Sequence, residues 1–153
     1  MLDGIFETMR LFLPTLALML LANSVAADRP NIVFMLADDM GYGDLACYGN
    51  PVIQSPNLDQ LAEEGVRLLN CYAASPNCSP ARTAIMTGRS PYRVGMYDWA
   101  RYKPMHIPSE ELTLPEVIGG SGYQTMFAGK WHCSGDSNLI SGTQPNPGDH
   151  GFD

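Results

Sequence analysis

The stretch Cys78-Ser79-Pro80-Ala81-Arg82 places a thiol, a proline and an arginine within five positions. Pro80 suits the first turn of a helix, because the missing N–H costs nothing there and φ is already helical. We expect Ser79 to cap this helix and Gly88 to end it. Cys78 would then lie at the positive end of the helix dipole, with Arg82 one turn further along the same face. Such an arrangement can bind a tetrahedral anion beside a reactive side chain.

The composition is that of a globular protein rather than a disordered one. The chain has 153 residues, of which 45% are hydrophobic and 16% charged, enough for one domain with a core. Its net charge of −7 argues against a nucleic-acid binder, which would carry a basic surface. An anionic substrate would be repelled at long range, so its binding requires a local cation or metal site.

The N-terminal part has the pattern of an export signal. The apolar run Leu11–Ala22 is too short for a comfortable membrane span, and the small residues Val25-Ala26-Ala27 predict cleavage before Asp28. Residues 1–27 are therefore predicted to be a signal peptide and the protein to be exported, periplasmic or extracellular. Acidic residues precede the run where positive charge is expected, and a true start at Met9 would remove them. The alternative is a buried core helix.

A second segment ends in paired carboxylates. Residues 31–37 form a continuous apolar run, typical of a strand buried on both faces of a parallel sheet. Asp38 and Asp39 follow at its carboxyl end, where ligand sites of such sheets gather. Adjacent carboxylates suit a hard cation with oxygen ligands. The alternative is a solvated turn built from Asp and Gly.

Further elements complete an α/β pattern. A helix is predicted from Pro56, capped by Ser55 and closed by Gly65, with Leu58, Leu61 and Ala62 as its apolar face and Asp59, Glu63 and Glu64 in solvent. Residues 66–72 and 123–128 are predicted strands, and the capping-box pattern of Thr113 and Glu116 starts a short helix between them. These elements predict a mostly parallel sheet flanked by helices.

Polar side chains also follow the strand at 123–128. Lys130 and His132 are two apart, so both face one way if the extended backbone continues. The alternative is a surface lysine beside a structural histidine. Residues 88–108 are predicted to be an irregular surface loop, in which Trp99, Arg101, Lys103 and His106 could touch a substrate.

The four cysteines do not form a dense disulfide framework. If Cys78 takes part in the chemistry of the site and is not available for a disulfide, the other three cysteines, Cys47, Cys71 and Cys133, allow at most one intramolecular disulfide.

These motifs resemble those of the type I sulfatases, which belong to the alkaline-phosphatase-like superfamily. The resemblance runs from about Pro30 to Asp153, and its matching stretches occur in family order. The family usually continues Gly-Lys-Trp-His with Leu-Gly, whereas Cys133-Ser134 follows here. The matching stretches are Pro30-Asn31-Ile32-Val33 with Asp38-Asp39-Met40-Gly41, Cys78-x-Pro80-x-Arg82, Gly129-Lys130-Trp131-His132 and His150-Gly151-Phe152-Asp153.

The resemblance implies a sulfuric ester hydrolase acting on a sulfate-ester substrate, for which a sulfated carbohydrate is one candidate. A formylglycine-generating enzyme would oxidise Cys78 to formylglycine, whose hydrated aldehyde attacks sulfur. Asp38, Asp39 and the modified Cys78 would hold Ca²⁺. Arg82 would stabilise the hydrated aldehyde, Lys130 would bind a sulfate oxygen, and His132 would assist deprotonation.

The resemblance also implies that residues 28–153 are the N-terminal part of a sulfatase catalytic domain, incomplete at the C-terminal side. The family takes further metal ligands from a later part of the chain, and two carboxylates fall short of the six to eight oxygens that Ca²⁺ prefers. The fragment by itself is therefore expected to be inactive. Alternative functions are a phosphonate or phosphate ester hydrolase of the same superfamily, or a non-catalytic truncated remnant.

The signal-peptide hypothesis is testable by N-terminal sequencing of protein expressed in a Gram-negative host. We expect the exported product to begin at or near Asp28, because peptidases read the small residues of Val25-Ala26-Ala27. A cytoplasmic product that retains Met1 or Met9 would show that the apolar run is not an export signal.

Overall fold

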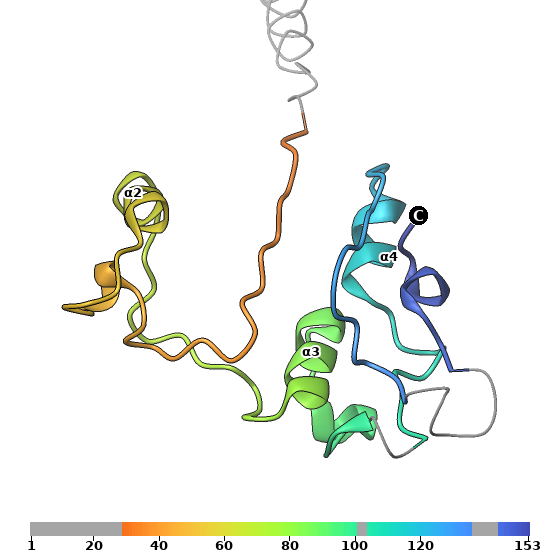
Figure 1. The fold of residues 1–153 in the computed structure, drawn as a ribbon. Coiled ribbons are helices and arrows are strands. Elements are labelled where there is room, and N and C mark those ends of the chain that lie inside the picture. The colour runs from red at the N-terminus through yellow and green to blue at the C-terminus, as the bar shows by residue number, and fades with distance from the viewer. Residues whose placement is uncertain (1–28, 101–103, 136–143) are drawn as a thin grey trace, which may run out of the picture. The chain divides into compact units, whose positions relative to one another are not determined.

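The computed structural model describes residues 29–100, 104–135 and 144–153 (Figure 1). The predicted signal peptide therefore lies outside the described residues. The chain divides into two compact units, residues 1–37 and 38–153. Within the described ranges, no helix is both long enough and apolar enough to cross a membrane.

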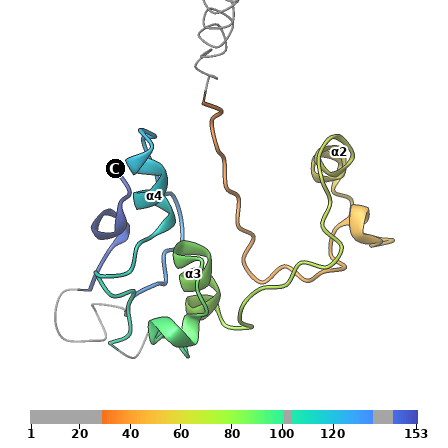
Figure 2. The same cartoon turned by 180° about the vertical axis from the view of Figure 1, so that it is seen from behind.

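Short helices joined by irregular segments make up the second unit. Helix α3 contacts both η2 and α4, and α3 and α4 lie side by side from either viewpoint (Figures 1 and 2). Helix α2 packs against η1. The elements are η1 (Ala46–Tyr48), α2 (Pro56–Glu64), α3 (Cys78–Thr87), η2 (Pro91–Val94), α4 (Leu114–Gly120) and η4 (Pro147–His150).

The N-cap of α3 lies two residues before the predicted one. Pro80 lies in the first turn and Gly88 ends the helix with φ 63°, as predicted. The cap, however, is Asn77, whose backbone is extended, and not Ser79. Ser79 is fully buried within the helix, and its Oγ accepts a hydrogen bond of 3.1 Å from the amide of Ala100. The serine thus anchors the loop after η2 instead of capping.

Helix α2 has the predicted bounds but not the predicted faces. Leu58 and Leu61 are 41% and 55% exposed, so the apolar face lacks a covering layer among the described residues. Asp59 is half-buried rather than a solvated charge. It accepts hydrogen bonds from the Cys47 amide (2.8 Å) and the Ser55 hydroxyl (2.9 Å), which connect the helix to η1.

The predicted parallel sheet is not confirmed, because no strand is present among the described residues. Val33 in the first predicted strand is 80% exposed, Val66 in the second 88%, and Met126 in the third 85%. A strand needs hydrogen-bonding partners, since its backbone groups are not satisfied within the segment. None of these three segments has a neighbouring strand among the described residues.

The core lies where a surface loop was predicted. Residues 88–99 and 104–108 are irregular apart from η2, as expected, but Met96, Ala100 and Ile107 are fully buried. Ile107 packs with Met86 of α3 and Cys133, and its amide donates to the Cys133 carbonyl (3.2 Å). The segment is therefore structural and holds α3 against the region after Lys130.

All four cysteines are described, and all four are free thiols, so the one disulfide that the sequence allowed is not formed. Cys133 is fully buried, and burial raises the pKa of its thiol to about 12. The departure from the family pattern at this position therefore supplies a small apolar core residue.

The predicted capping box begins α4 and reaches the C-terminal segment. Glu116 accepts hydrogen bonds from the amide (2.7 Å) and hydroxyl (2.8 Å) of Thr113, and these bonds lower the pKa of its carboxyl group. The Thr113 hydroxyl also donates to the carbonyl of His150 (2.8 Å). Gly151, with φ 88°, leaves a Cβ position only 2.5 Å from Cγ of Glu116. Only glycine suits both this backbone conformation and this close approach.

Replacing Gly151 by alanine should therefore destabilise the fold. We expect a loss of about 1–3 kcal/mol in the free energy of unfolding, from the left-handed backbone and the contact with Glu116. Urea denaturation measures the change. Gly119→Ala in α4 is the matched control, because a Cβ there meets nothing within 4 Å and alanine favours a helix. Equal stability of the Gly151→Ala variant and the parent would contradict the described path of the C-terminal segment.

Candidate active site

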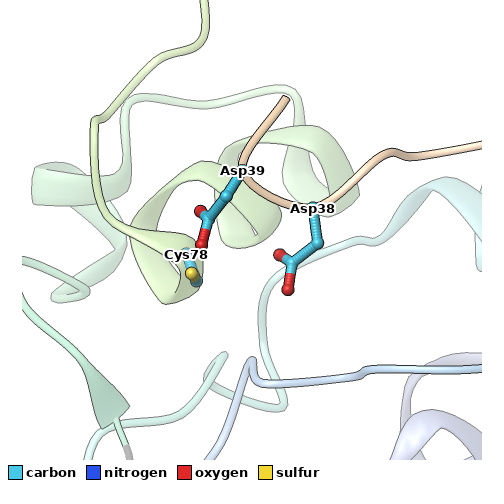
Figure 3. Close-up of side chains that lie close together, drawn as sticks. All are labelled: Asp38, Asp39 and Cys78. Carbon is cyan, nitrogen blue, oxygen red and sulfur yellow. The ribbon is translucent and has the colours of Figure 1, made fainter. Parts of the chain in front are cut away.

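Three potential metal-binding side chains converge at the start of α3. Asp38, Asp39 and Cys78 each place one ligand atom within 4.8 Å of the others (Figure 3). Cys78 is the first residue of α3, at the positive end of the helix dipole, whereas the aspartates come from the segment that begins the second unit. The backbone of Asp39 is left-handed, with φ 56°, a conformation that aspartate tolerates better than most residues.

Two cations hold the carboxylate of Asp38. Arg82 Nη2 lies 2.9 Å from Asp38 Oδ1, and Lys130 Nζ lies 2.8 Å from Asp38 Oδ2. Hydrogen bonds from Lys130 and then Arg82 lower the pKa of Asp38 below its ordinary value. The carboxylate is therefore ionised at neutral pH and has one cation on each oxygen.

Lys130 connects this ion pair to the thiol. Its Nζ lies 3.5 Å from Cys78 Sγ, and its main-chain carbonyl accepts a 2.7 Å hydrogen bond from Arg82 Nη1. The contact with Asp38 is the main cause that raises the pKa of the ammonium group. Arg82 thus fixes both the backbone of Lys130 and the carboxylate to which its side chain binds.

His132 does not continue an extended backbone after Lys130. Gly129 has φ 111° and His132 has φ 54°, so the chain turns on both sides of the lysine. The premise that made Lys130 and His132 face one way is therefore wrong. His132 is half-buried, and it is outside the group formed by Asp38, Asp39 and Cys78.

The donor set fits part of a calcium site. Two adjacent carboxylates supply hard oxygen ligands, and Asp38 is 47% exposed and hence open to a cation. The sulfur of Cys78 is a soft donor, which calcium does not favour, whereas an oxygen at this position would complete an all-oxygen group. Arg82 and Lys130 provide two positive charges beside that position.

Sequence reasoning identified each residue of this cluster but not the contacts between them. The spacing of Cys78 and Arg82 predicted their shared helix face, and the strand-end rule placed the aspartates and Lys130 near a ligand. The bonds from Arg82 to Asp38 and to the Lys130 carbonyl join residues 44 and 48 positions apart, and no local pattern indicates them. In the loop before α4, Trp99 and His106 are exposed, while Arg101 and Lys103 lie outside the described residues.

Known proteins with similar sequences contain the same region. The chain is 43% identical over 138 residues to human (Homo sapiens) steryl-sulfatase, covering 86% of this chain and 24% of that protein. It is 48% identical over 120 residues to human arylsulfatase A, and the match covers 77% of this chain and 24% of arylsulfatase A. Pig (Sus scrofa) N-acetylgalactosamine-6-sulfatase is 45% identical over 137 residues, covering 84% and 25%. The chain spans about a quarter of the length of these curated relatives.

Solved structures agree with the sequence comparisons. The crystal structure of Ps i-CgsB superposes with a TM-score of 0.72 at 32% identity, covering 82% of this chain and 27% of that chain. A second structure comes from a Bacteroides thetaiotaomicron locus for metabolism of multiple glycosaminoglycans. It superposes with a TM-score of 0.71 at 34% identity, and the match covers 83% of this chain and 28% of that chain. These neighbours support the alkaline-phosphatase-like fold class. The Sulfatase family model matches residues 30–153, and with these relatives it shows that the chain belongs to the sulfatase family.

Proposed function

We propose that the protein containing this chain hydrolyses sulfate esters at residue 78, after oxidation of Cys78 to formylglycine by a formylglycine-generating enzyme. The single observation that carries the proposal is the convergence of Lys130, Arg82 and two aspartates on the first residue of α3. Helix N-termini bind tetrahedral oxyanions, and the nucleophile is located at this one.

Lys130 and Arg82 bind and orient the sulfate. The ammonium of Lys130 lies 3.5 Å from the sulfur of Cys78, which is close enough to bind an oxygen of a sulfate held at residue 78. Arg82 is one helical turn away, with only 11% of its side chain exposed, and stabilises the charge of the hydrated aldehyde. Since the whole chain carries a charge of −7, these two cations supply the local attraction that an anionic substrate needs.

Asp38, Asp39 and the oxidised residue 78 would hold calcium. When bound, the metal supplies positive charge that polarises sulfate oxygens and favours ionisation of the hydrated aldehyde. The two aspartates contribute at most four oxygens of the six to eight required. The remaining ligands therefore come from sequence that the relatives have beyond the matched quarter, as the family resemblance implies.

His132 is assigned the role of general base. Its imidazole follows Lys130 by two residues in a half-buried segment, and a neutral imidazole can accept the proton of the hydrated aldehyde. Its left-handed backbone is consistent with this assignment, because strained conformations are often found at functional sites.

The proposed substrate is a sulfated carbohydrate encountered after export. N-acetylgalactosamine-6-sulfatase and the structural neighbour from the glycosaminoglycan locus support a sulfated sugar. Ps i-CgsB has also been solved in complex with a neocarrahexaose, at a TM-score of 0.65 to this chain. The predicted signal peptide of residues 1–27 would deliver the enzyme to the periplasm or the exterior, where such polymers occur.

Modification of Cys78 is the first test of this proposal. After co-expression with a formylglycine-generating enzyme, the peptide that contains residue 78 should be about 18 Da lighter than the thiol form, because oxygen replaces sulfur and two hydrogens. Peptide mass spectrometry measures the difference. The tryptic peptide that contains Cys47, a free thiol before Arg67, is the internal control and should keep its mass. An unmodified Cys78 would contradict the proposed nucleophile.

Turnover by the full-length protein is the second test. Cys78→Ala should reduce hydrolysis of a chromogenic aryl sulfate by at least ~1000-fold, because removal of a covalent nucleophile disables both steps of the reaction. Residues 28–153 alone should bind calcium weakly and show no turnover.

Arg82 and Lys130 would bind a phosphate as well, so a phosphate monoester is assayed beside the sulfate. A preference for the phosphate would overturn the sulfatase assignment in favour of a phosphoesterase.

The ion pairs of Asp38 yield a prediction about pH. Lys130 is the leading cause of the lowered pKa of Asp38, so Lys130→Met should raise the pKa of that carboxyl group toward its ordinary value of 3.8. Carbon-13 NMR titration of the carboxylates measures this change. Arg89→Gln removes a cation that pairs instead with Glu111 (2.5 Å) and should leave Asp38 unchanged. An unaltered titration in Lys130→Met would show that the ion pair does not form in solution.

A further inference from the structure

The side chain after Lys130 lies in an aromatic cluster that the proposed chemistry does not use. Trp131 packs edge-on against Phe127 (ring centroids 5.6 Å apart) and Phe152 (6.3 Å) and lies 5.7 Å from the imidazole of His150. Phe127 and Phe152 also contact each other, at 5.3 Å. Aromatic pairs at such separations stabilise one another beyond the burial of their surfaces, so the cluster can fix the indole position.

Two of these rings belong to the segment 150–153, which other contacts hold in place. The Thr125 amide donates to Asp153 Oδ2 (2.6 Å), the Asp153 amide donates to the Thr125 carbonyl (3.1 Å), and the Thr125 hydroxyl donates to the Gly151 carbonyl (2.7 Å). On the other side, Thr113 binds the carbonyl of His150. The segment is thereby fixed between α4 and the residues that lead to Lys130.

The cluster borders the same core that supports α3. Trp131 and Phe152 both pack against the buried group formed by Met86, Ile107 and Cys133, and Met86 is in α3 together with Cys78 and Arg82. The backbone at Lys130 therefore has two supports, the hydrogen bond from Arg82 on one side and the enclosed indole of the next residue on the other. A shift of the indole would move the Lys130 main chain and, through it, the ammonium near Cys78.

We propose that Phe152 and His150 are positioning residues, which hold Lys130 at the nucleophile by packing against Trp131. This inference rests on the proposed role of Lys130 in sulfate binding. Because the lysine is flanked by left-handed residues at Gly129 and His132, its backbone lacks a regular helix or ladder to fix it. The aromatic cluster supplies that constraint from a segment about 20 residues further along the chain.

The test is a double-mutant cycle in the full-length enzyme with a chromogenic aryl sulfate. Phe152→Leu removes the ring contacts but keeps an apolar side chain, and we expect kcat/KM to fall by ~10-fold or more, since small displacements of a catalytic group are costly. In a Lys130→Met background the same change should cost less than about twofold, because the group it positions is absent. Phe152→Tyr retains the ring and should stay within about twofold of the parent. An equal loss from Phe152→Leu in both backgrounds would overturn the proposal.

A second readout does not depend on activity. Phe152→Leu should increase the acetylation rate of Lys130 by ~3-fold or more relative to Lys103, the other lysine of the sequence, because its Nζ would leave Asp38 more often. Val94→Ala, a buried truncation in η2, is the control for general destabilisation and should not change this ratio. An unchanged ratio in Phe152→Leu would refute positioning. If Lys130→Met keeps full activity, the proposed role of Lys130 in sulfate binding fails, and the acetylation ratio still decides the positioning role.

Discussion

The carboxylate of Asp38 is the point on which the site depends, because two cations from different segments bind its two oxygens. Arg82 comes from α3 and Lys130 from the turn before Trp131, 44 and 92 positions from the aspartate. Two like charges placed this close would repel each other without an anion between them. Asp38 therefore makes it possible for Arg82 and Lys130 to stay beside residue 78 without a bound anion.

In the proposed function, the same arrangement would place a metal ion and a sulfate in one electrostatic system. A divalent cation at Asp38 and Asp39 would compete with Lys130 and Arg82 for the carboxylate oxygens. Its binding would weaken the hold of Asp38 on both side chains, which then have more of their hydrogen-bonding capacity for a sulfate. The cost of this competition is small where the groups are solvated, and Asp38 is about half exposed.

Local sequence patterns predicted those features that local forces control. Pro80 lies in the first turn of α3 and Gly88 ends it, the Thr113–Glu116 pair begins α4, and Cys78 and Arg82 share one helix face, because caps and helical spacing act within a few residues. The sheet was not confirmed, since pairing of strands depends on segments far away in the chain. Ser79 was misjudged for a related reason: its hydroxyl satisfies the amide of Ala100, a partner that no nearby residue reveals. The burial of Met96, Ala100 and Ile107 could not be predicted either, because their segment has no regular spacing of apolar residues.

The cationic side of the site, formed by Arg82 and Lys130, is held in place although the segments predicted to be strands are exposed. Its supports are short-range in space: the start of α3, the core at Met86 and Cys133, and the C-terminal segment around Phe152. None of these requires a neighbouring strand. The two aspartates are different, because they follow a segment in which Val33 and Met35 are 80% and 72% exposed. Burying those side chains in a sheet would restrict the aspartates in turn. Because Asp38 also binds Arg82 and Lys130, restricting this aspartate would restrict the two cations as well.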